Sequence, residues 1–412
     1  MFTATRALAL RPRSPRRLGL AVALVLALLV VLVLVLPPPG RLSTARPVSC
    51  DVFASPSGSD LSGNGSLRAP FASVQTLDQA LAPGQTGCLR AGTYGGLGAW
   101  HQIDTNGTSG GQITISSYPG ETATIVGWVD MEAAYTTLEN VRIDGSNTRY
   151  PAHPVGIACS TTHVSQPLVI VGHDDVLQYV DYYQSVAALR GTGIGVGFWG
   201  DADNTIIRYD KIHDVGNCLA YDHLIYLSHG NNVQIYDNWL WNDPHGRGVQ
   251  LYPAPTNARV FDNVIDFAGE GFVISDNPGT TVSGNEIFNN IVTNSTGLPS
   301  EGLTGEGVHD SYGGKPGTNN SFFNNDIYNN PGGIGRLSAA VTTYGNTTTN
   351  PQFLNAAAHD YQLQATSTDA NWNTWNGNLS VNPAESARPD TRSRAAPDQA
   401  RAAPKGADQS RS

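Results

Sequence analysis

Apolar and polar residues alternate in short segments that recur between residues 205 and 327, each ending in Asn or Asp, one further residue and an aliphatic side chain. The segments are Thr205–Ile212, Val233–Leu240, Ala258–Ile265, Thr281–Ile287 and Ser321–Ile327. Their Asn or Asp falls at positions 210, 238, 263, 285 and 325, in steps of 28, 25, 22 and 40 residues. A coil of this length buries its apolar face only by stacking on its neighbours. The pattern therefore predicts a solenoid of stacked parallel strands.

The recurring amides and a second set of strands complete the predicted coil. An amide at one corner of every coil can form a ladder along the axis, each side chain bonding to the next. A second strand follows after a turn, in Leu224–Ser228, Gly248–Tyr252, Gly271–Ser275 and Gly307–Ser311. With a period of two, the residues pointing inward are Ile225, Leu227, Val249, Leu251, Phe272 and Ile274. Those pointing outward are Tyr226, Ser228, Gln250, Tyr252, Val273 and His309.

The composition agrees with an all-β fold. Charged residues make up only 14% of the chain, 45 residues are Gly, and no long segment after Thr44 keeps a 3.6-residue apolar period. The sequence therefore predicts little helix beyond the N-terminus. Residues 50–382 form the expected solenoid domain, and residues 383–412, rich in Ala, Pro, Arg, Asp and Ser, form a disordered tail.

The N-terminus has the features of an export segment. Residues 1–19 contain five Arg and no acid, and residues 20–36 are an unbroken apolar run. Basic residues before an apolar helix keep the N-terminus in the cytoplasm. The run is long for a signal peptide core and only just reaches the length of a membrane span, so both interpretations stay open. With either, residues 37–49 are a linker and the solenoid is extracellular, secreted or anchored to the membrane.

The charge of the exported part limits its partners. Seven of the 24 basic residues lie at or before Arg46, which leaves 17 basic against 34 acidic side chains, a net charge of −17. This argues against nucleic acid as a partner, and against membrane contact beyond the N-terminal segment. We expect a monomer.

Four cysteines in an exported chain predict two disulfides. Their order along the chain pairs Cys50 with Cys88 and Cys159 with Cys218. No cysteine has the spacing to His or Cys that is typical of a metal site. The sequence assigns no cofactor, and calcium is the one that it leaves open.

Four parts of the chain carry a further signal: Phe53–Gln75, Pro83–Tyr94, the repeats, and the ending Asn350–Asn355 with Asp360–Leu363. Together they resemble the pectin-lyase-like superfamily, over about residues 50–364. The resemblance implies a right-handed parallel β-helix with a short helix over Ser73–Leu81 that caps its N-terminal end. The superfamily includes lyases, hydrolases, epimerases, adhesins and phage spikes, so the fold does not decide the activity.

Reactive side chains gather in successive coils on the predicted outer face. They are Asp222, His223, Tyr226 and His229, then Asp243, His245, Arg247, Gln250 and Tyr252, and further along Glu270 and His309. Outward residues on adjacent coils are about 4.8 Å apart, a spacing that suits an extended sugar chain. We therefore expect a polysaccharide substrate along this row. The alternative is a structural role, in which these side chains only hydrogen-bond the turns.

Imidazole, phenol and guanidinium groups together provide what elimination from a uronate requires. That reaction needs a group to neutralise the carboxylate, a base for the C5 proton and an acid for the departing oxygen. We assign Arg247 with Gln250 to the first role, His223 or His245 to the second, and Tyr226 or Tyr252 to the third. The expected catalytic residues are His223, Tyr226, His245 and Arg247, and the other members of the row bind substrate.

One tripeptide adds a narrower resemblance. Asp243-Pro244-His245 is similar to the Asp-Pro-His motif of alginate C5-epimerases, which share this fold. The Tyr-Gly pair that precedes the motif in that family is replaced here by Leu240 and Trp241, with Asn242 next. The leading hypothesis is thus a lyase or C5-epimerase acting on a uronate-containing glycan.

Two other functions stay open. A glycoside hydrolase needs two carboxylates about 5–9.5 Å apart, which Asp222, Asp243 and Glu270 could supply. A non-catalytic solenoid that binds carbohydrate or has a structural role on the cell surface is the third hypothesis. Stacking on sugar rings is a candidate role for Trp199, Trp239 and Trp241, with packing as the alternative.

Overall fold

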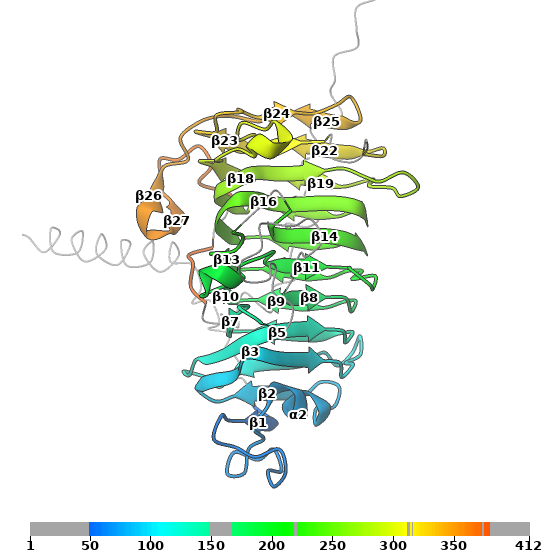
Figure 1. Ribbon diagram of the computed structural model, residues 1–412, viewed down its shortest axis with the longest axis vertical. Helices are drawn as coiled ribbons and strands as arrows, with labels where there is room; N and C mark the ends of the chain where they lie inside the picture. Colours follow the sequence, from blue (N-terminus) through cyan, green and yellow to red (C-terminus); the bar gives the residue numbers. More distant parts are fainter. Residues whose placement is uncertain are drawn as a thin grey trace, which may run out of the picture. The chain divides into compact units, whose positions relative to one another are not determined.

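The computed structural model describes residues 49–148, 167–217, 221–310, 314, 316–372 and 375–379. Over these residues the chain winds into coils that stack on one another (Figure 1). Successive coils are joined by parallel strand pairs in two large sheets. The domain is therefore all-β and built as a parallel β-helix, as the repeat pattern predicts.

The first large sheet has 11 strands and takes one strand from each successive coil. In order they are β1 (Val52–Ala54), β2 (Thr86–Leu89), β4 (Ile113–Ser117), β6 (Thr136–Glu139), β9 (Val176–Gln178), β12 (Ile206–Arg208), β15 (Gln234–Tyr236), β17 (Arg259–Phe261), β19 (Glu286–Phe288), β22 (Asn320–Phe323) and β25 (Val341–Tyr344).

The second sheet has 14 strands, several of them long enough to run along two sides of a coil. They are β3 (Gly92–Ile103), β5 (Ala123–Met131), β7 (Arg142–Asp144), β8 (Leu168–Ile170), β10 (Asp181–Tyr183), β11 (Ile194–Val196), β13 (Lys211–His213), β14 (His223–Asn231), β16 (Trp239–Thr256), β18 (Val264–Ile274), β20 (Ile291–Thr293), β21 (Val308–His309), β23 (Asp326–Tyr328) and β24 (Gly335–Arg336). A separate antiparallel hairpin joins β26 (Phe353–Asn355) to β27 (Asp360–Leu363).

Helices are short in the described part of the chain. They are α2 (Val74–Gln79) and the 3-10 turns η1 (Ala187–Leu189), η2 (Pro299–Glu301) and η3 (Ala356–Ala358). The sequence predicts the first over Ser73–Leu81, and Ser73 is its N-cap, with a hydroxyl that accepts from the Thr76 amide at 3.1 Å. Leu77 packs so tightly on β2 that a Cβ at Gly87 would lie 2.4 Å from it. The helix therefore lies against the first coils, at their N-terminal end (Figure 1).

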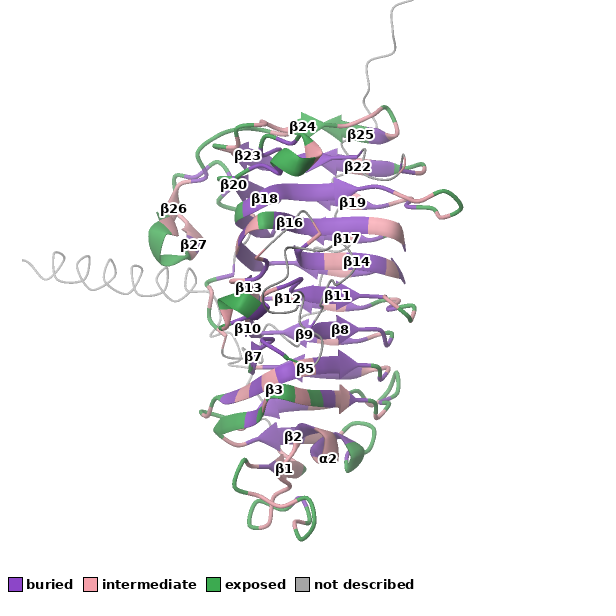
Figure 2. Cartoon of the chain, in the orientation of Figure 1, coloured by how far each residue is buried: buried purple, intermediate pink, exposed green. Residues whose placement is uncertain are grey.

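The interior of the coils is a continuous apolar core. All six residues predicted to point inward, from Ile225 to Ile274, are buried in it. Figure 2 shows buried strands throughout the stack, with exposed residues mainly in the connecting loops. The inward half of the period-two pattern is thus confirmed. Of the residues predicted to point outward, Tyr226 and Tyr252 are half-buried, and the others are buried: Ser228, Gln250, Val273 and His309.

An amide ladder runs along one corner, as predicted, but with Asn290 in the place predicted for Asn285. Its members are Asp210, Asn238, Asn263, Asn290, Asn325 and Asn346, spaced 28, 25, 27, 35 and 21 residues apart. Each Asn Oδ1 accepts the backbone N–H of the member one coil earlier, at 2.9–3.1 Å. These bonds satisfy polar groups that the bend of the chain would otherwise leave buried without partners.

The sequence prediction of Asn285 as a member of this ladder is wrong. Asn285 bonds instead to Asn320, in a second and shorter ladder. A left-handed residue precedes both amides, Gly284 at φ 73° and Asn289 at φ 54°, and the bond partners decide: Asn290 Oδ1 accepts the Asn263 N–H, as the main ladder requires. The true repeat of this coil therefore lies five residues further along than the aligned Asn285 indicates.

Aromatic residues on the outer side of the first sheet form a stack of rings that runs along the coils. Centroids of successive rings lie 4.8–6.0 Å apart along Tyr179, Tyr209, Tyr236, Phe261, Phe288, Phe323 and Tyr344. Tyr361 and Trp375 belong to this cluster, Phe353 packs against it, and Trp239 and Trp241 are buried in it. These two residues therefore do not form a sugar-stacking surface, whereas Trp199 is 58% exposed.

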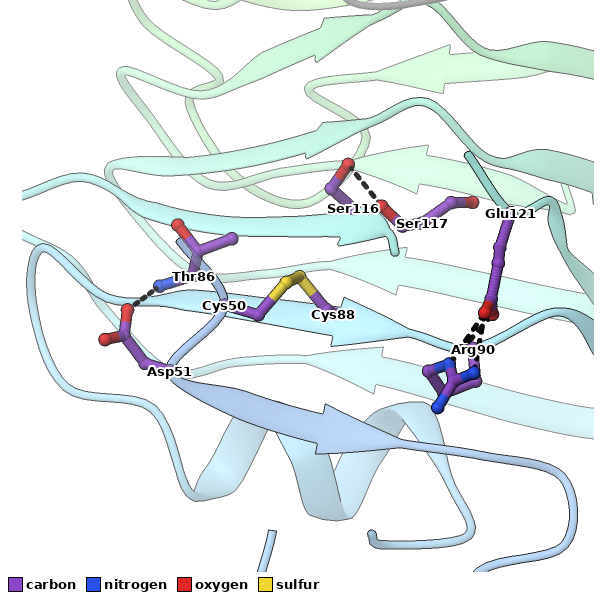
Figure 3. Close-up of a disulfide and its surroundings, with 8 residues drawn as sticks. All are labelled: Cys50, Asp51, Thr86, Cys88, Arg90, Ser116, Ser117 and Glu121. Carbon is purple, nitrogen blue, oxygen red and sulfur yellow. Dashed lines mark hydrogen bonds and ion pairs between the residues drawn. A yellow bond between two sulfur atoms is a disulfide. The ribbon is translucent and has the colours of Figure 1, made fainter. Parts of the chain in front are cut away.

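The disulfide between Cys50 and Cys88 is confirmed, with a Cα–Cα distance of 5.6 Å (Figure 3). It joins the chain two residues before β1 to β2 and so fastens the first coil to the next. Cys159 and Cys218 lie outside the described residues, as do the predicted export segment, linker and C-terminal tail. Within the residues described, no helix has the length and apolar character needed to cross a membrane.

The main ladder predicts that loss of a single amide lowers the free energy of unfolding strongly. Replacing Asn290 by Ala removes three bonds from its Nδ2, to Val260 O, Phe288 O and Asn325 Oδ1, and leaves the Asn263 amide without its acceptor. We expect the free energy of unfolding to fall by about 3 kcal/mol. Guanidinium unfolding followed by circular dichroism measures this change. Asn355→Ala, at the exposed end of β26 and without a side-chain cap bond, is the control and should change it by less than about 0.5 kcal/mol; equal losses in both variants would contradict the role of the ladder.

Candidate functional site

Strand pairing places the predicted reactive residues in two adjacent rows on the outer face of β14, β16 and β18. One row has Tyr226 opposite Gln250, Gln250 opposite Val273, and Val273 opposite His309. The other row joins His223, Arg247 and Glu270. Residues from four coils are therefore neighbours only because the coils stack in this register.

Arg247 is the centre of a buried ionic network. Its Nε donates to Glu270 Oε1 at 2.6 Å and its Nη2 to Glu301 Oε2 at 2.5 Å, while His309 Nδ1 pairs with the other oxygen of Glu270. Arg247 and Glu270 are both 0% exposed. A buried guanidinium is tolerated because its charge is compensated and hydrogen-bonded. The network gives Arg247 a positioning role, holding η2 against the sheet, and direct contact with a substrate carboxylate stays a prediction.

His223 lies behind the accessible surface and is stacked on Tyr226. Their ring centroids are 4.8 Å apart with planes at 22°, and His223 Nε2 is 2.7 Å from Gln250 Oε1. Burial, together with the nearby positive charge of Arg247, lowers the pKa of His223 to about 3. The imidazole is therefore neutral at neutral pH, and its Nδ1 lies 3.5 Å from the Thr192 hydroxyl.

Three aromatic rings form the accessible part of the site. Tyr226 and Tyr252 are half-buried, with centroids 6.5 Å apart and planes 24° apart. Phe198 packs edge-on against Tyr226 at 4.8 Å, and the Tyr252 hydroxyl donates to Asn277. Flat apolar rings with a polar tip are suited to stack on a sugar ring and to hydrogen-bond its hydroxyls. We call Phe198, Tyr226 and Tyr252 the aromatic face.

The residues of the Asp-Pro-His tripeptide lie in different environments. Asp243 is fully buried and His245 is exposed. The Asp243 carboxylate fits between two glycines, since a Cβ at Gly216 would lie 2.0 Å from its Oδ1 and one at Gly246 2.3 Å from its Oδ2. Burial, and then the charge of Asp222, raises the pKa of Asp243 well above its usual value. The neutral form of Asp243 is thus favoured relative to that of an exposed carboxyl.

The remaining predicted residues lie around this centre. Asp222 is buried and accepts the Asn217 N–H at 3.1 Å, and the half-buried His229 bonds Ser228 Oγ at 2.9 Å. In the described part of the chain, no group of three or more His, Cys, Asp or Glu residues is arranged to hold a metal ion. The catalytic and binding roles, and the calcium expectation, stay predictions.

Sequence reasoning missed two residues of the site. Glu301, the second partner of Arg247, lies in the Gly-rich insertion, where no periodicity marks a position. Phe198 lies in a loop after β11, and its only signal in the sequence is its place beside Trp199.

Comparisons with known proteins agree on the fold. A family model described as disaggregatase related matches residues 225–388. The crystal structure of pectate lyase Pel9A is 15% identical, with a TM-score of 0.50, over 78% of this chain and 91% of that one. A rhamnogalacturonan lyase is 12% identical, with a TM-score of 0.51, over 79% of this chain and 95% of that one. A comparison with curated proteins finds no match. At these identities the likeness shows the fold alone: the domain is a parallel β-helix.

The buried imidazole predicts a specific pH dependence of stability. The unfolded chain binds a proton at a histidine below about pH 6.5, whereas folded His223 stays neutral until about pH 3. The stability due to this group is therefore complete above about pH 6.5 and is lost as the pH falls, by up to about 1.4 kcal/mol per pH unit.

Replacing His223 by Gln should make the fall in stability between about pH 6.5 and pH 4.5 shallower by that amount. Urea unfolding at several pH values measures it. The control is His245→Gln, which replaces an exposed histidine of β16 and should leave the wild-type slope unchanged. A His223→Gln slope identical to that of the wild type would show that this histidine is not held neutral.

Proposed function

We propose that this protein is a polysaccharide-active enzyme whose substrate lies along the outer face of β14, β16 and β18. The observation that carries the proposal is the stacking of neutral His223 on half-exposed Tyr226, in a face of rings open to a ligand. We infer that the substrate is a uronate-containing glycan and the reaction a lyase elimination or a C5 epimerisation.

Both reactions begin with removal of the proton on the carbon next to the uronate carboxylate. An imidazole is suited to take this proton, and the candidates are the buried His223 and the exposed His245. The Tyr226 phenol then donates a proton, to the departing glycosidic oxygen in a lyase or to the opposite side of the sugar carbon in an epimerase. Gln250 is hydrogen-bonded to His223 at 2.7 Å, so its amide is placed beside the imidazole that is one candidate for the base.

The buried network supports this arrangement from the interior. Arg247 uses its Nε and Nη2 on Glu270 and Glu301, so its contribution is to fix the strand that carries Gln250 and the turn η2. The named lyases among the structural neighbours support a glycan as the substrate class.

A second candidate function rests on the carboxyl pair. A glycoside hydrolase requires a protonated acid and an ionised base or nucleophile, and the raised pKa of Asp243 beside Asp222 is the electrostatic arrangement that produces such a pair. Both side chains are buried, whereas the aromatic face is accessible. For this reason the elimination or epimerisation is preferred.

We also infer that the domain works outside the cell, either secreted or tethered by its N-terminus. The basic and apolar pattern of residues 1–36 supports this location. The Cys50–Cys88 disulfide supports it too, since such bonds persist mainly in oxidising compartments.

One assay separates the candidate reactions. The full-length chain, kept in a mild detergent, is incubated with alginate, pectate and glycosaminoglycans. A rise in the ultraviolet absorbance of an unsaturated uronate indicates a lyase, and solvent deuterium at C5 without chain cleavage indicates an epimerase. New reducing ends without that absorbance would indicate the hydrolase instead. Binding with none of these signals would favour a non-catalytic solenoid.

The role of the phenol leads to a direct prediction. Tyr226→Phe keeps the ring and its packing on His223 but removes the hydroxyl, so kcat should fall by at least about 100-fold with KM changed little. Steady-state kinetics on the glycan identified by the assay measure the effect. Tyr135→Phe, on a half-buried tyrosine outside the site, is the control and should keep wild-type kcat. A Tyr226→Phe variant with full turnover would remove this residue from the mechanism.

A further inference from the structure

A cleft of about 570 Å³ lies away from the aromatic face. Its walls come from the turn after β4, the corner before β7, the corner between β9 and β10, and residues 378–379. None of the candidate catalytic residues lines it. We call it the corner cleft and define it by Glu121, Thr122, Asn140, Arg142, Tyr179 and Asp181. Its volume lies within the range of small-molecule sites, roughly 300–1,000 Å³.

A fixed ion pair forms part of the wall. Arg142 Nε and Nη2 donate to Asp181 Oδ2 at 3.0 and 2.9 Å, and the guanidinium lies over the Tyr183 ring at 5.4 Å. His213 Nε2 bonds the other oxygen of Asp181 at 3.0 Å. Arg142 is thus held in one orientation although its side chain is 49% exposed. A ligand that meets it does not have to order a mobile side chain, which lowers the entropic cost of binding.

The cleft offers donors and acceptors side by side. The Asn140 amide and the Thr122 hydroxyl each both donate and accept, Arg142 provides N–H donors, and Asp181 is an acceptor. Every hydroxyl of a sugar also both donates and accepts, so vicinal hydroxyls match a wall in which the two kinds of group alternate.

The charges of the cleft favour a neutral ligand. Its lining contains the carboxylates of Glu121 and Asp181 and the guanidinium of Arg142. Arg90 pairs with Glu121 through bonds of 2.6–3.0 Å (Figure 3), and Arg142 pairs with Asp181. An anionic ligand would therefore meet a carboxylate beside each cation and would lose solvation without gaining an unpaired positive charge.

We propose that the corner cleft is a binding site for neutral sugar residues, separate from the candidate catalytic face. This site does not depend on the proposed function. It would hold a neutral part of a glycan, or a neutral saccharide by itself, on another side of the coils from the aromatic face.

The test is isothermal titration calorimetry of the full-length chain, in a detergent without a sugar head group. The probes are cellobiose, lactose and maltose, with digalacturonic acid as the anionic counterpart. We expect at least one neutral disaccharide to bind with a dissociation constant in about the millimolar range, and more tightly than digalacturonic acid.

Two variants locate the binding. Arg142→Gln removes the guanidinium, while His213 still holds Asp181, and should weaken binding about tenfold, the loss of one charge-assisted hydrogen bond. Thr122→Val removes an exposed hydroxyl and serves as the second variant where Arg142→Gln is not folded. Arg259→Gln, which breaks the Arg259–Glu286 pair elsewhere on the first sheet, is the matched control and should bind as the wild type does.

Three results would overturn the proposal. They are no binding of any neutral disaccharide at about 10 mM, tighter binding of digalacturonic acid, and wild-type affinity in both Arg142→Gln and Thr122→Val. Tyr226→Phe should leave this binding unchanged, so failure of the cleft proposal and failure of the catalytic proposal give different results.

Discussion

Pairing between successive coils is the constraint on which this structure depends. A single coil has no core of its own, and each strand of the two large sheets makes its backbone hydrogen bonds with the coil before or after it. The amide ladder from Asp210 to Asn346 repeats this dependence at the corner, because each Asn oxygen accepts a backbone N–H of the neighbouring coil. The stacked rings from Tyr179 to Tyr344 repeat it again on the outer side of the first sheet. Position along the axis is therefore fixed at several points of every coil.

The candidate site is a consequence of this register. Residues that are 23, 39 and 54 positions apart in sequence meet in one buried network around Arg247 and Glu270. Charges without exposure to solvent are stable only where their partners are held in place, and here three different coils hold them. The buried network then supports a half-exposed layer, in which Tyr226 rests on His223 and Phe198 packs against its edge. The chemistry proposed for the protein requires both layers. The buried ionic network holds the strands in place, and the half-exposed rings are accessible to a sugar.

The parts of the fold that follow a period could be predicted from the sequence, and the parts set by loops could not. Ile225 to Ile274 point inward as the period of two requires, and Ser73 begins the short helix. Asn285 was assigned to the wrong ladder because two amides stand in one coil, each after a left-handed residue, and only their partners in the next coil, Asn320 and Asn325, distinguish them. Glu301 and Phe198 lie in loops, where contacts depend on how the chain folds back. Trp239 and Trp241 are packed rather than exposed because the rings of Tyr361 and Trp375, remote in sequence, lie against them.

A crystal structure of the Tyr226→Phe variant with a bound oligosaccharide of the active glycan tests the central claim most directly. The account predicts sugar rings on the outer face of β14 and β16, stacked on residues 226 and 252, with the carbon next to a uronate carboxylate beside an imidazole of His223 or His245. An oligosaccharide bound only on another face of the coils, with no contact to these residues, would contradict it.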